Sequence, residues 1–247
     1  MQGYTLKDKI ILSIFSFLGF FVFLKRNPLI SDVILKNKNC LFYCRKWSDD
    51  ALVVGFYEKE LIEYLHNYED NGIFIDIGAH IGKYSILMAK NGMKVIAFEP
   101  DLGSFKILKK NIALNNLNNI KALNLACWDS EKEMKLFKLI NKNTAGSTLL
   151  KPFSGYISNS FSIVKTTRLD NVVRKLKLLH KDIKSIKIDV EGAEIKVLEG
   201  ATEILKNSHP QIVFEAWDNE KLKQITNFLA KYNYEIKQID KSNYVAM

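Results

Sequence analysis

The sequence is poor in cysteine and has fewer acidic than basic residues. Its three cysteines, Cys40, Cys44 and Cys127, supply neither the four paired ligands of a structural zinc site nor an even-numbered disulfide framework, so we expect free thiols in a reducing compartment. Lysine and arginine number 36 against 27 aspartate and glutamate, a net charge of +9. This excess requires a basic surface but names no partner. With 47% hydrophobic and 26% charged residues, the chain is globular rather than disordered.

One apolar segment raises the question of a membrane. Residues 10–24, IILSIFSFLGFFVFL, contain no charge and lie between Lys9 and Lys25. As a helix they span about 22 Å, less than the ~30 Å of a hydrocarbon core, and KRNP follows where a signal peptide has small residues for cleavage. Two alternatives stay open: a membrane anchor or interfacial helix, and a helix buried against the domain. In an anchored chain, the basic residues after the segment predict a cytoplasmic C-terminal domain.

From Gly72 onward, short apolar runs alternate with amphipathic segments. GIFIDIG, KVIAFEP, IKALNLA, SIKIDVEG and QIVFEAW predict strands, and residues 84–91 and 102–115 predict helices between them. This alternation is typical of an α/β fold, a Rossmann-like, doubly wound and mainly parallel sheet. Residues 131–167 interrupt it and predict a small extra β insertion. We divide the chain into an apolar helix (1–30), strands and a helix leading into the core (31–71, with strands over 33–56 and a helix over 58–68), and the main domain (72–247).

A glycine-containing turn follows the first strand of that domain. In FIDIGAHIGKYS, Asp76 ends the strand, Gly78 and Gly82 follow, and a helix begins. Glycines allow a ligand to approach the backbone, and the helix N-terminus attracts an anion. A dinucleotide fingerprint has a glycine where His80 stands, so the turn suits a smaller ligand with one carboxylate, whose ammonium group Asp76 could hold. For His80, packing within the loop is the alternative to a contact with ligand.

The next two strands also end in candidate ligand-binding residues. Glu99, in VIAFEPD, stands where an acid accepts hydrogen bonds from the ribose hydroxyls of an adenosine cofactor. In IKALNLACWD, we expect the strand to end at residues 126–129, with its backbone at an adenine edge and Asp129 available to the exocyclic amine. A surface turn with a buried Trp128 is the alternative.

A second acidic cluster occurs in SIKIDVEGAEIKVLEGA, residues 185–201. It places Asp189, Glu191 and Glu194 at a strand-to-helix junction, and Glu215 ends the following strand in QIVFEAW. Carboxyl ends of parallel strands share one edge of the sheet, so these acids should converge on one crevice with Asp76 and Glu99. The alternative is structural, because acids stabilise the first turn of a helix and Asp189 could be its N-cap.

These motifs together resemble the FkbM-type methyltransferases, a branch of the S-adenosylmethionine-dependent class I methyltransferase fold. The resemblance is carried by FIDIGAHIGKYS, VIAFEPD, the asparagines of KKNIALNNL, LNLACWD, TTRLD, IVFEAW and, most specifically, IDVEGAE followed by VLEGA. It implies a seven-stranded sheet with a reversed last hairpin, bound S-adenosyl-L-methionine, and methylation of a hydroxyl on a sugar, glycan or other small molecule.

The resemblance and the spacing together give the predicted site. Asp189 is the first candidate to take the proton of an acceptor hydroxyl or to orient it, and Glu191, Glu194 and Glu215 are further catalytic candidates. No metal site is predicted, although Glu191 and Glu194 leave Mg²⁺ as a minority alternative. The cofactor-binding candidates are Asp76, Gly78, Ala79, His80, Gly82, Glu99, Ala126, Cys127, Asp129 and Asp189.

Two other functions are alternatives to methyl transfer. An NAD-dependent oxidoreductase would share the turn and the strand-end acid, and a membrane-tethered, non-catalytic binding module would share the fold. Nucleic acid is not expected as a partner, because VEGAE follows Asp189 where nucleic-acid amino-methylases have a proline-rich aromatic tetrapeptide. The basic run 165–187 predicts a solvated helix face, with an anionic sugar or lipid headgroup as its functional alternative.

Overall fold

The computed structural model describes residues 32–46, 48, 50–55, 58–68, 70–139, 147–150 and 157–247. The apolar segment at residues 10–24 lies outside these ranges, so the helix expected there and its relation to a membrane stay predictions. Among the described residues, no helix combines the length and the apolar character needed to cross a bilayer.

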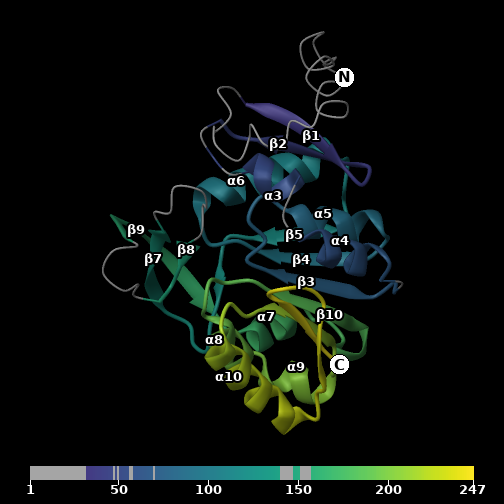
Figure 1. Ribbon diagram of the computed structural model, residues 1–247, viewed down its shortest axis with the longest axis vertical. Helices are drawn as coiled ribbons and strands as arrows, with labels where there is room; N and C mark the ends of the chain where they lie inside the picture. The colour runs from purple at the N-terminus through teal and green to yellow at the C-terminus, as the bar shows by residue number, and fades with distance from the viewer. Residues whose placement is uncertain are drawn as a thin grey trace.

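A seven-stranded sheet forms the centre of the molecule (Figure 1), in the order β12-β13-β11-β10-β3-β4-β5. The strands β11, β10, β3, β4 and β5 are parallel, whereas β13 runs antiparallel to both β11 and β12. The α/β fold with a reversed last hairpin is therefore confirmed. The strands are β3 (Ile73–Ile77), β4 (Lys94–Phe98), β5 (Ile120–Leu123), β10 (Ile183–Ile188), β11 (Gln211–Glu215), β12 (Ile236–Gln238) and β13 (Asn243–Ala246).

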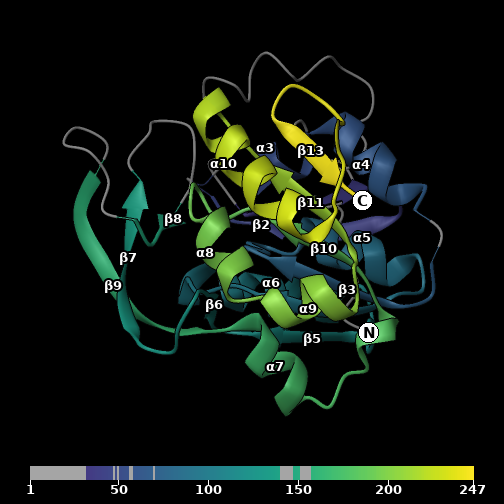
Figure 2. The same cartoon turned by 90° about the horizontal axis from the view of Figure 1, so that it is seen from below.

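Helices cover both faces of this sheet (Figures 1 and 2). One face carries α4 (Lys59–His66), α5 (Lys83–Lys90) and α6 (Leu102–Leu114). The other carries α7 (Leu169–Lys175), α8 (Glu194–Glu199), α9 (Thr202–Asn207) and α10 (Asn219–Leu229), and two 3-10 turns lie at His180–Asp182 and Ala230–Tyr232. The helices predicted over 58–68, 84–91 and 102–115 are thus confirmed to within a few residues.

The strands bury side chains on both faces, as the parallel arrangement requires. In β3, Ile73, Ile75 and Ile77 pack with residues of α7 to α10, while Phe74 packs with residues of α4 and α5. Strand β10 follows the same alternation, with Ile186 and Ile188 in the first of these clusters. Its Lys187 pairs in register with Asp76 and is also buried, so an ammonium and a carboxylate lie among apolar residues.

The predicted β insertion forms a separate four-stranded sheet in the order β6-β9-β7-β8. Its strands are β6 (Ala126–Cys127), β7 (Glu133–Leu139), β8 (Ser147–Thr148) and β9 (Ile157–Thr167). The expectation that one strand runs from residue 120 to about 129 is wrong. Asn124 donates from Nδ2 to the carbonyls of Glu99 and Pro100, 2.8 and 2.9 Å away, and β6 then pairs with β9. The chain therefore changes sheets after Leu123.

An N-terminal unit packs on α5 and α6. It consists of the antiparallel hairpin β1 (Val33–Asn37) and β2 (Cys40–Cys44), followed by α3 (Asp50–Gly55). Strands are thus confirmed over 33–44, but residues 50–55 form a helix, contrary to the prediction. We refer to β1, β2 and α3 as the N-terminal unit.

Candidate active site

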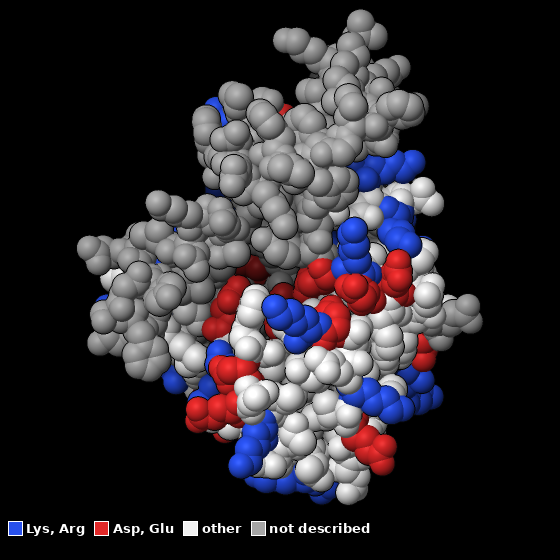
Figure 3. Space-filling view, viewed as in Figure 1, with Lys and Arg blue, Asp and Glu red and all other residues white. Residues whose placement is uncertain are grey.

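A cavity of about 610 Å³ opens at the carboxyl ends of the central strands. Its wall includes Gly78 after β3, Glu99 after β4, Asp189 after β10 and Glu215 at the end of β11. Its size suits a drug-sized ligand, and this edge of an open α/β sheet is where ligands bind. Figure 3 shows acidic side chains gathered around a recess in the middle of the face it displays.

The turn after β3 requires glycine for close packing. Gly78 has a φ of 83°, and a Cβ at this position would lie 1.8 Å from the carbonyl oxygen of Asp189. The backbone N–H groups of Gly78 and Ala79 both donate to the carbonyl of Phe98, at 3.0 and 2.9 Å. The turn is thereby tied to β4 and lies against the residue that follows β10. Gly82, with a φ of 93°, precedes the first residue of α5.

Glu99 is bound to the same turn. Its Oε2 accepts from the backbone N–H of His80 at 2.8 Å, and its Oε1 accepts from the backbone N–H of Asp101 at 2.7 Å. Burial raises the pKa of Glu99 to about 8, although both hydrogen bonds act in the opposite direction. Glu99 therefore lines the cavity as a rigidly held carboxyl group. Asp101 caps α6 by accepting from the N–H of Ser104.

The structure brings eight of the predicted residues onto the cavity wall. They are Gly78, His80, Glu99, Ala126, Cys127, Asp189, Glu191 and Glu215. The strand-end acids thus converge as expected, and Ala126 and Cys127 supply a largely apolar wall beside Glu99. The N-cap alternative for Asp189 is wrong, because α8 begins only at Glu194, with Ala193 as its N-cap.

The other predicted residues lie behind the wall or away from it. Asp76 is buried beneath the turn, where its Oδ2 accepts from the Ser85 hydroxyl at 2.5 Å and its Oδ1 finds no hydrogen-bond partner among the described residues. Burial raises the pKa of Asp76. Ala79 and Gly82 shape the turn from behind, outside the residues that line the cavity. An ammonium group in the cavity would therefore not meet Asp76 directly in this conformation.

Glu194 and Asp129 are occupied by structural contacts. The Glu194 carboxylate is buried and accepts from the backbone N–H of Gly192 at 3.0 Å. Asp129 pairs with Lys196 at 2.9 Å and accepts from Ser130, and it does not line the cavity. Glu191 lines the cavity and Glu194 does not. Within the described part of the chain, no group of three or more His, Cys, Asp or Glu side chains is arranged to hold a metal ion.

A buried charge cluster beside Asp189 was missed by the sequence analysis. Lys187 Nζ lies 2.9 Å from Asp189 Oδ2 and 4.6 Å from the ring centre of Tyr84. The Tyr84 hydroxyl donates to Glu58 at 2.5 Å, and Lys83 lies 3.4 Å from the same carboxylate. Burial lowers the pKa of Lys187, but the carboxylates of Asp189, Glu58 and Asp76 together raise it above its ordinary value. The only signal in the sequence was a lysine inside the apolar run SIKI.

Glu215 differs from Asp189 in its surroundings. Burial, and then the nearby charges of Asp189 and Glu58, raise the pKa of Glu215 to about 9. These causes favour the protonated form of Glu215, and its Oε1 accepts a hydrogen bond from the Ser242 hydroxyl at 3.2 Å. The cavity thus contains a carboxyl group with a raised pKa near an aspartate paired with a buried lysine.

Several lining residues come from elements that gave no functional signal in the sequence. The N-terminal unit and the start of α4 contribute Val53, Glu58 and Glu60, the β insertion contributes Leu136, Ser147 and Leu149, and the C-terminal region contributes Trp217 and residues 240–243. Trp217 is 65% exposed at the cavity. The basic run 165–187 covers the end of β9, α7 and most of β10, so it is not the single helix face predicted. Most of its basic side chains are exposed, whereas Arg168 and Lys184 are partly buried and Lys187 is buried.

A seven-stranded sheet with one reversed strand, a glycine turn after β3 and an acid after β4 defines the class I methyltransferase fold. The family model of the methyltransferase FkbM domain matches residues 76–236, more than half of the sequence. The chain therefore belongs to the FkbM methyltransferase family, and methyl transfer is its class of activity.

Individual relatives agree with this assignment. The chain is 28% identical over 200 residues to Methyltransferase sdnD of Sordaria araneosa, covering 69% of this chain and 76% of that protein. It is 23% identical over 191 residues to Methyltransferase 1 of Beauveria bassiana (strain ARSEF 2860), covering 68% and 76%. The crystal structure of methyltransferase FkbM from Methylobacillus flagellatus KT has a TM-score of 0.53 and 17% identity over 73% of this chain. That likeness shows the fold, and this chain covers 44% of that longer protein.

Proposed function

We propose that this protein transfers a methyl group from S-adenosyl-L-methionine to a hydroxyl group of a sugar, a glycan or glycolipid, or another small molecule. The observation that carries the proposal is that one cavity is lined both by the glycine turn and Glu99 and by the strand-end acids Asp189 and Glu215. The first pair suits an adenosine-containing ligand and the second suits a hydroxyl acceptor.

The chemistry of the wall fits the methyl donor. Glu99 can accept hydrogen bonds from a ribose diol, while Ala126 and Cys127 offer apolar surface and backbone groups to an adenine. Acids of the wall other than Glu99 and Glu215, among them Glu60, Asp189 and Glu191, outnumber the one lysine among its described residues, Lys241, which favours a cationic ligand over an anionic one. When bound, S-adenosylmethionine supplies an electrophilic methyl group on a positively charged sulfur.

The residues of the chain then have to align the acceptor and remove its proton. Asp189, fixed by Lys187, accepts the hydrogen bond of the acceptor hydroxyl and receives its proton as the new bond forms. Protonated Glu215 donates a hydrogen bond to a second oxygen of the acceptor. Glu191, on the loop that begins with Asp189, also lines the cavity, and we assign it a place beside the reacting hydroxyl. Exclusion of water by the apolar residues Leu136 and Leu149 strengthens these interactions.

The methyl donor is tested by calorimetric titration with S-adenosylhomocysteine, the product form of the donor. We expect binding at one site per chain. Absence of binding to protein that is folded by circular dichroism would overturn the proposal. A parallel fluorescence titration with NADH tests the oxidoreductase alternative, which the methyltransferase relatives do not favour, and we expect no saturable binding.

The acceptor class is tested by incubating the protein with labelled S-adenosylmethionine and a cell extract. The products are separated into small-molecule, glycan, lipid, protein and nucleic-acid fractions. We expect the label in the small-molecule, glycan or lipid fraction, whereas label confined to nucleic acid would contradict the proposed substrate class. An Asp189→Asn variant that transfers label at the unchanged rate would contradict the assigned role of Asp189. Membrane association through residues 10–24 and a cytoplasmic location stay predictions.

A further inference from the structure

The N-terminal unit lies before the region matched by the family model, which begins at residue 76, yet it contacts the turn between β3 and α5. We refer to this turn, residues 78–82, as the cofactor turn. Strand β2 is held against α6 by two asparagine side chains one helical turn apart. Asn111 accepts from the N–H of Tyr43 at 2.7 Å, and Asn115 accepts from the N–H of Leu41 at 2.9 Å. Asn115 also donates to the carbonyl of Leu41 at 2.7 Å. The two amides thus take the place of a neighbouring strand along β2.

Asn111 also reaches the turn itself. Its Nδ2 donates to the carbonyl of Ile81 at 2.9 Å, within the segment between Gly78 and Gly82. Asn111 is fully buried. One side chain therefore connects β2, α6 and the cofactor turn, and the asparagines of KKNIALNNL gain a physical role that the sequence alone did not give.

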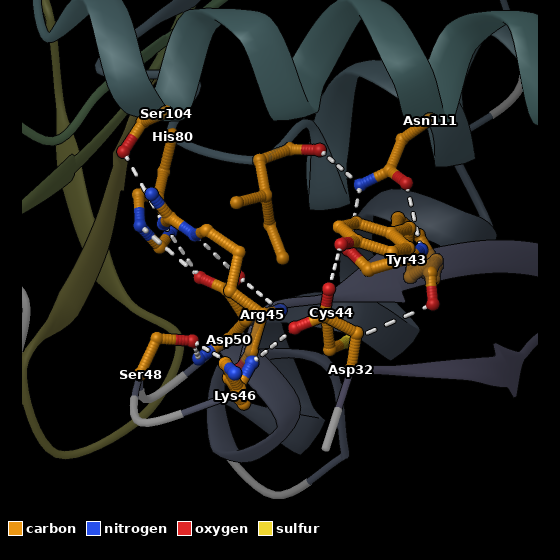
Figure 4. Close-up of polar contacts among 12 residues, drawn as sticks. Asp32, Tyr43, Cys44, Arg45, Lys46, Ser48, Asp50, His80, Ser104 and Asn111 are labelled. Atoms are coloured by element: carbon orange, nitrogen blue, oxygen red, sulfur yellow. Dashed lines mark hydrogen bonds and ion pairs between the residues drawn. The ribbon is translucent and has the colours of Figure 1, made fainter. Parts of the chain in front are cut away.

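A second connection runs through Asp50 at the start of α3 (Figure 4). Asp50 is completely buried and accepts three hydrogen bonds from Arg45, from its backbone N, Nε and Nη2, each 2.8 Å long. Arg45 Nη2 also lies 3.5 Å from the Ser104 hydroxyl of α6. A bidentate pair of this kind fixes the orientation of the carboxylate. Burial acts to raise the pKa of Asp50, but the hydrogen bonds and charge of Arg45 outweigh it and keep the pKa below its ordinary value.

The fixed carboxylate faces the imidazole of His80. Asp50 Oδ1 lies 3.8 Å from His80 Nε2, and Figure 4 shows the two side chains pointing toward each other. His80 has a φ of 51°, a left-handed conformation that is uncommon for a residue other than glycine. Its backbone N–H donates to Glu99, and its side chain lines the cavity. Asp50 is therefore connected to Glu99 through one residue.

We propose that Asp50 is a positioning residue for the cofactor site, which holds the left-handed turn at His80 so that the His80 N–H and Glu99 keep the geometry needed to bind the adenosine portion of the methyl donor. This inference rests on the proposed function. On this inference, the N-terminal unit contributes to cofactor binding although it lies outside the matched domain.

The geometry favours this role over a purely structural one. Arg45 alone would satisfy the buried carboxylate, because both oxygens of Asp50 already accept hydrogen bonds from it. The additional contact is made to a residue that lines the cavity and whose backbone holds Glu99. Asp50 on α3 faces the His80 imidazole, and Glu99 after β4 accepts from the His80 backbone N–H, so a change at Asp50 reaches the cofactor site through His80.

The test compares the affinity for S-adenosylhomocysteine in four proteins. We expect Asp50→Asn and His80→Asn each to bind about tenfold more weakly than the wild type, and the double variant to bind no more weakly than either single variant, because the two residues act in series. Asparagine at position 80 tolerates the left-handed backbone. Asp32→Asn is the matched control, since Asp32 is an exposed acid directly before β1 that accepts from the Lys46 N–H and from the Tyr43 hydroxyl, and we expect it to bind within about twofold of the wild type.

Two further measurements separate positioning from loss of fold. Hydrogen exchange at the Leu41 and Tyr43 amides reports whether β2 stays docked, and we expect it to be unchanged in Asp50→Asn. The Cε1–H resonance of His80, one of four histidines, should move when ligand binds to the wild type and should move less in Asp50→Asn. If the wild type binds S-adenosylhomocysteine and either single variant binds it as tightly as the wild type does, the inference is wrong. If the wild type itself does not bind, the proposed function fails instead.

Discussion

The ammonium of Lys187 lies 2.9 Å from the carboxylate of Asp189, and only 3% of the lysine side chain is exposed, against 29% of the aspartate. The pair joins the interior of the sheet to the cavity, because Lys187 is inside β10 and Asp189 is the first residue after it. Burial of an ion costs several kcal/mol of desolvation, which a close opposite charge can offset. The pairing with Asp189 therefore offsets the cost of burying Lys187, and it also fixes the carboxylate at the site.

Removal of this ammonium should destabilise the protein. In Lys187→Met, the carboxylates of Asp189 and Asp76 lose their buried counter-charge, and we expect a decrease of about 3 kcal/mol in the free energy of unfolding, measured with urea. The double variant with Asp189→Asn should lose at least about 1 kcal/mol less than the sum of the two single losses.

Lys184→Met serves as the control, because Lys184 lies on the same strand but is only partly buried, and its loss should stay within about 0.5 kcal/mol. Strictly additive losses in the double variant would show that Lys187 and Asp189 do not stabilise each other.

The pH dependence of stability should report the burial of Glu99. Its pKa is raised from 4.5 to about 8, so between these values the folded protein binds a proton that the unfolded chain releases. Stability contributed by the neutral form is fully present below the lower value and is lost as pH rises through the upper one. Compared with Glu99→Gln, the wild type should lose on the order of a few kcal/mol between about pH 5 and pH 8.5.

Urea unfolding of both proteins at several pH values measures this difference. Other carboxyl groups with raised pKa values, such as Glu215, contribute equally to both proteins and cancel in the comparison. Parallel pH profiles would mean that Glu99 is already ionised across this range, held so by its two backbone N–H donors.

The fold and the edge of the sheet that bears the site were predictable, because both follow from local patterns. Apolar runs with Gly78, Glu99 and Asp189 at their ends identify the strands, and parallel strands bring those ends together. The sequence does not tell which side chains near a turn point into the cavity. Asp76 was predicted to face a ligand, yet it lies buried beneath the turn, which packs closely against the backbone of Asp189.

Contacts between segments far apart in the chain could not be predicted either, because one sequence does not show which distant segments pack together. Lys187 in SIKI has the pattern of a lysine at the edge of a strand, and only the pairing of β10 with β3 places it beside Asp76. Asn111 shows no periodic signal for its contact with Tyr43, which is 68 residues away. The contribution of Val53 and Glu60 to the cavity likewise depends on how the N-terminal unit docks.

Gly78 should tolerate no side chain. An added Cβ would lie 1.8 Å from a backbone oxygen at a φ of 83°, so Gly78→Ala must displace either the turn or the loop after β10. We expect a loss of about 2 kcal/mol or more in unfolding free energy and no detectable binding of S-adenosylhomocysteine.

Gly55→Ala is the matched control, because a Cβ there meets nothing within 4 Å. That variant should be unchanged or more stable by about 0.5 kcal/mol. A Gly78→Ala protein with wild-type stability and affinity would show that the turn and the loop after β10 can separate without consequence.

Trp217 should affect the acceptor and leave the methyl donor unaffected. It is 65% exposed at the cavity and lies two residues after Glu215, which ends β11. An exposed indole beside a polar site offers a flat apolar surface on which an acceptor can stack. We expect Trp217→Ala to bind S-adenosylhomocysteine within about twofold of the wild type but to transfer label to the acceptor fraction about tenfold more slowly.

Leu179→Ala is the control, because Leu179 is 56% exposed but does not line the cavity, and it should change neither quantity. If Trp217→Ala instead weakens binding of S-adenosylhomocysteine and leaves transfer from saturating donor unchanged, Trp217 belongs to the donor side and the acceptor must enter from another part of the cavity.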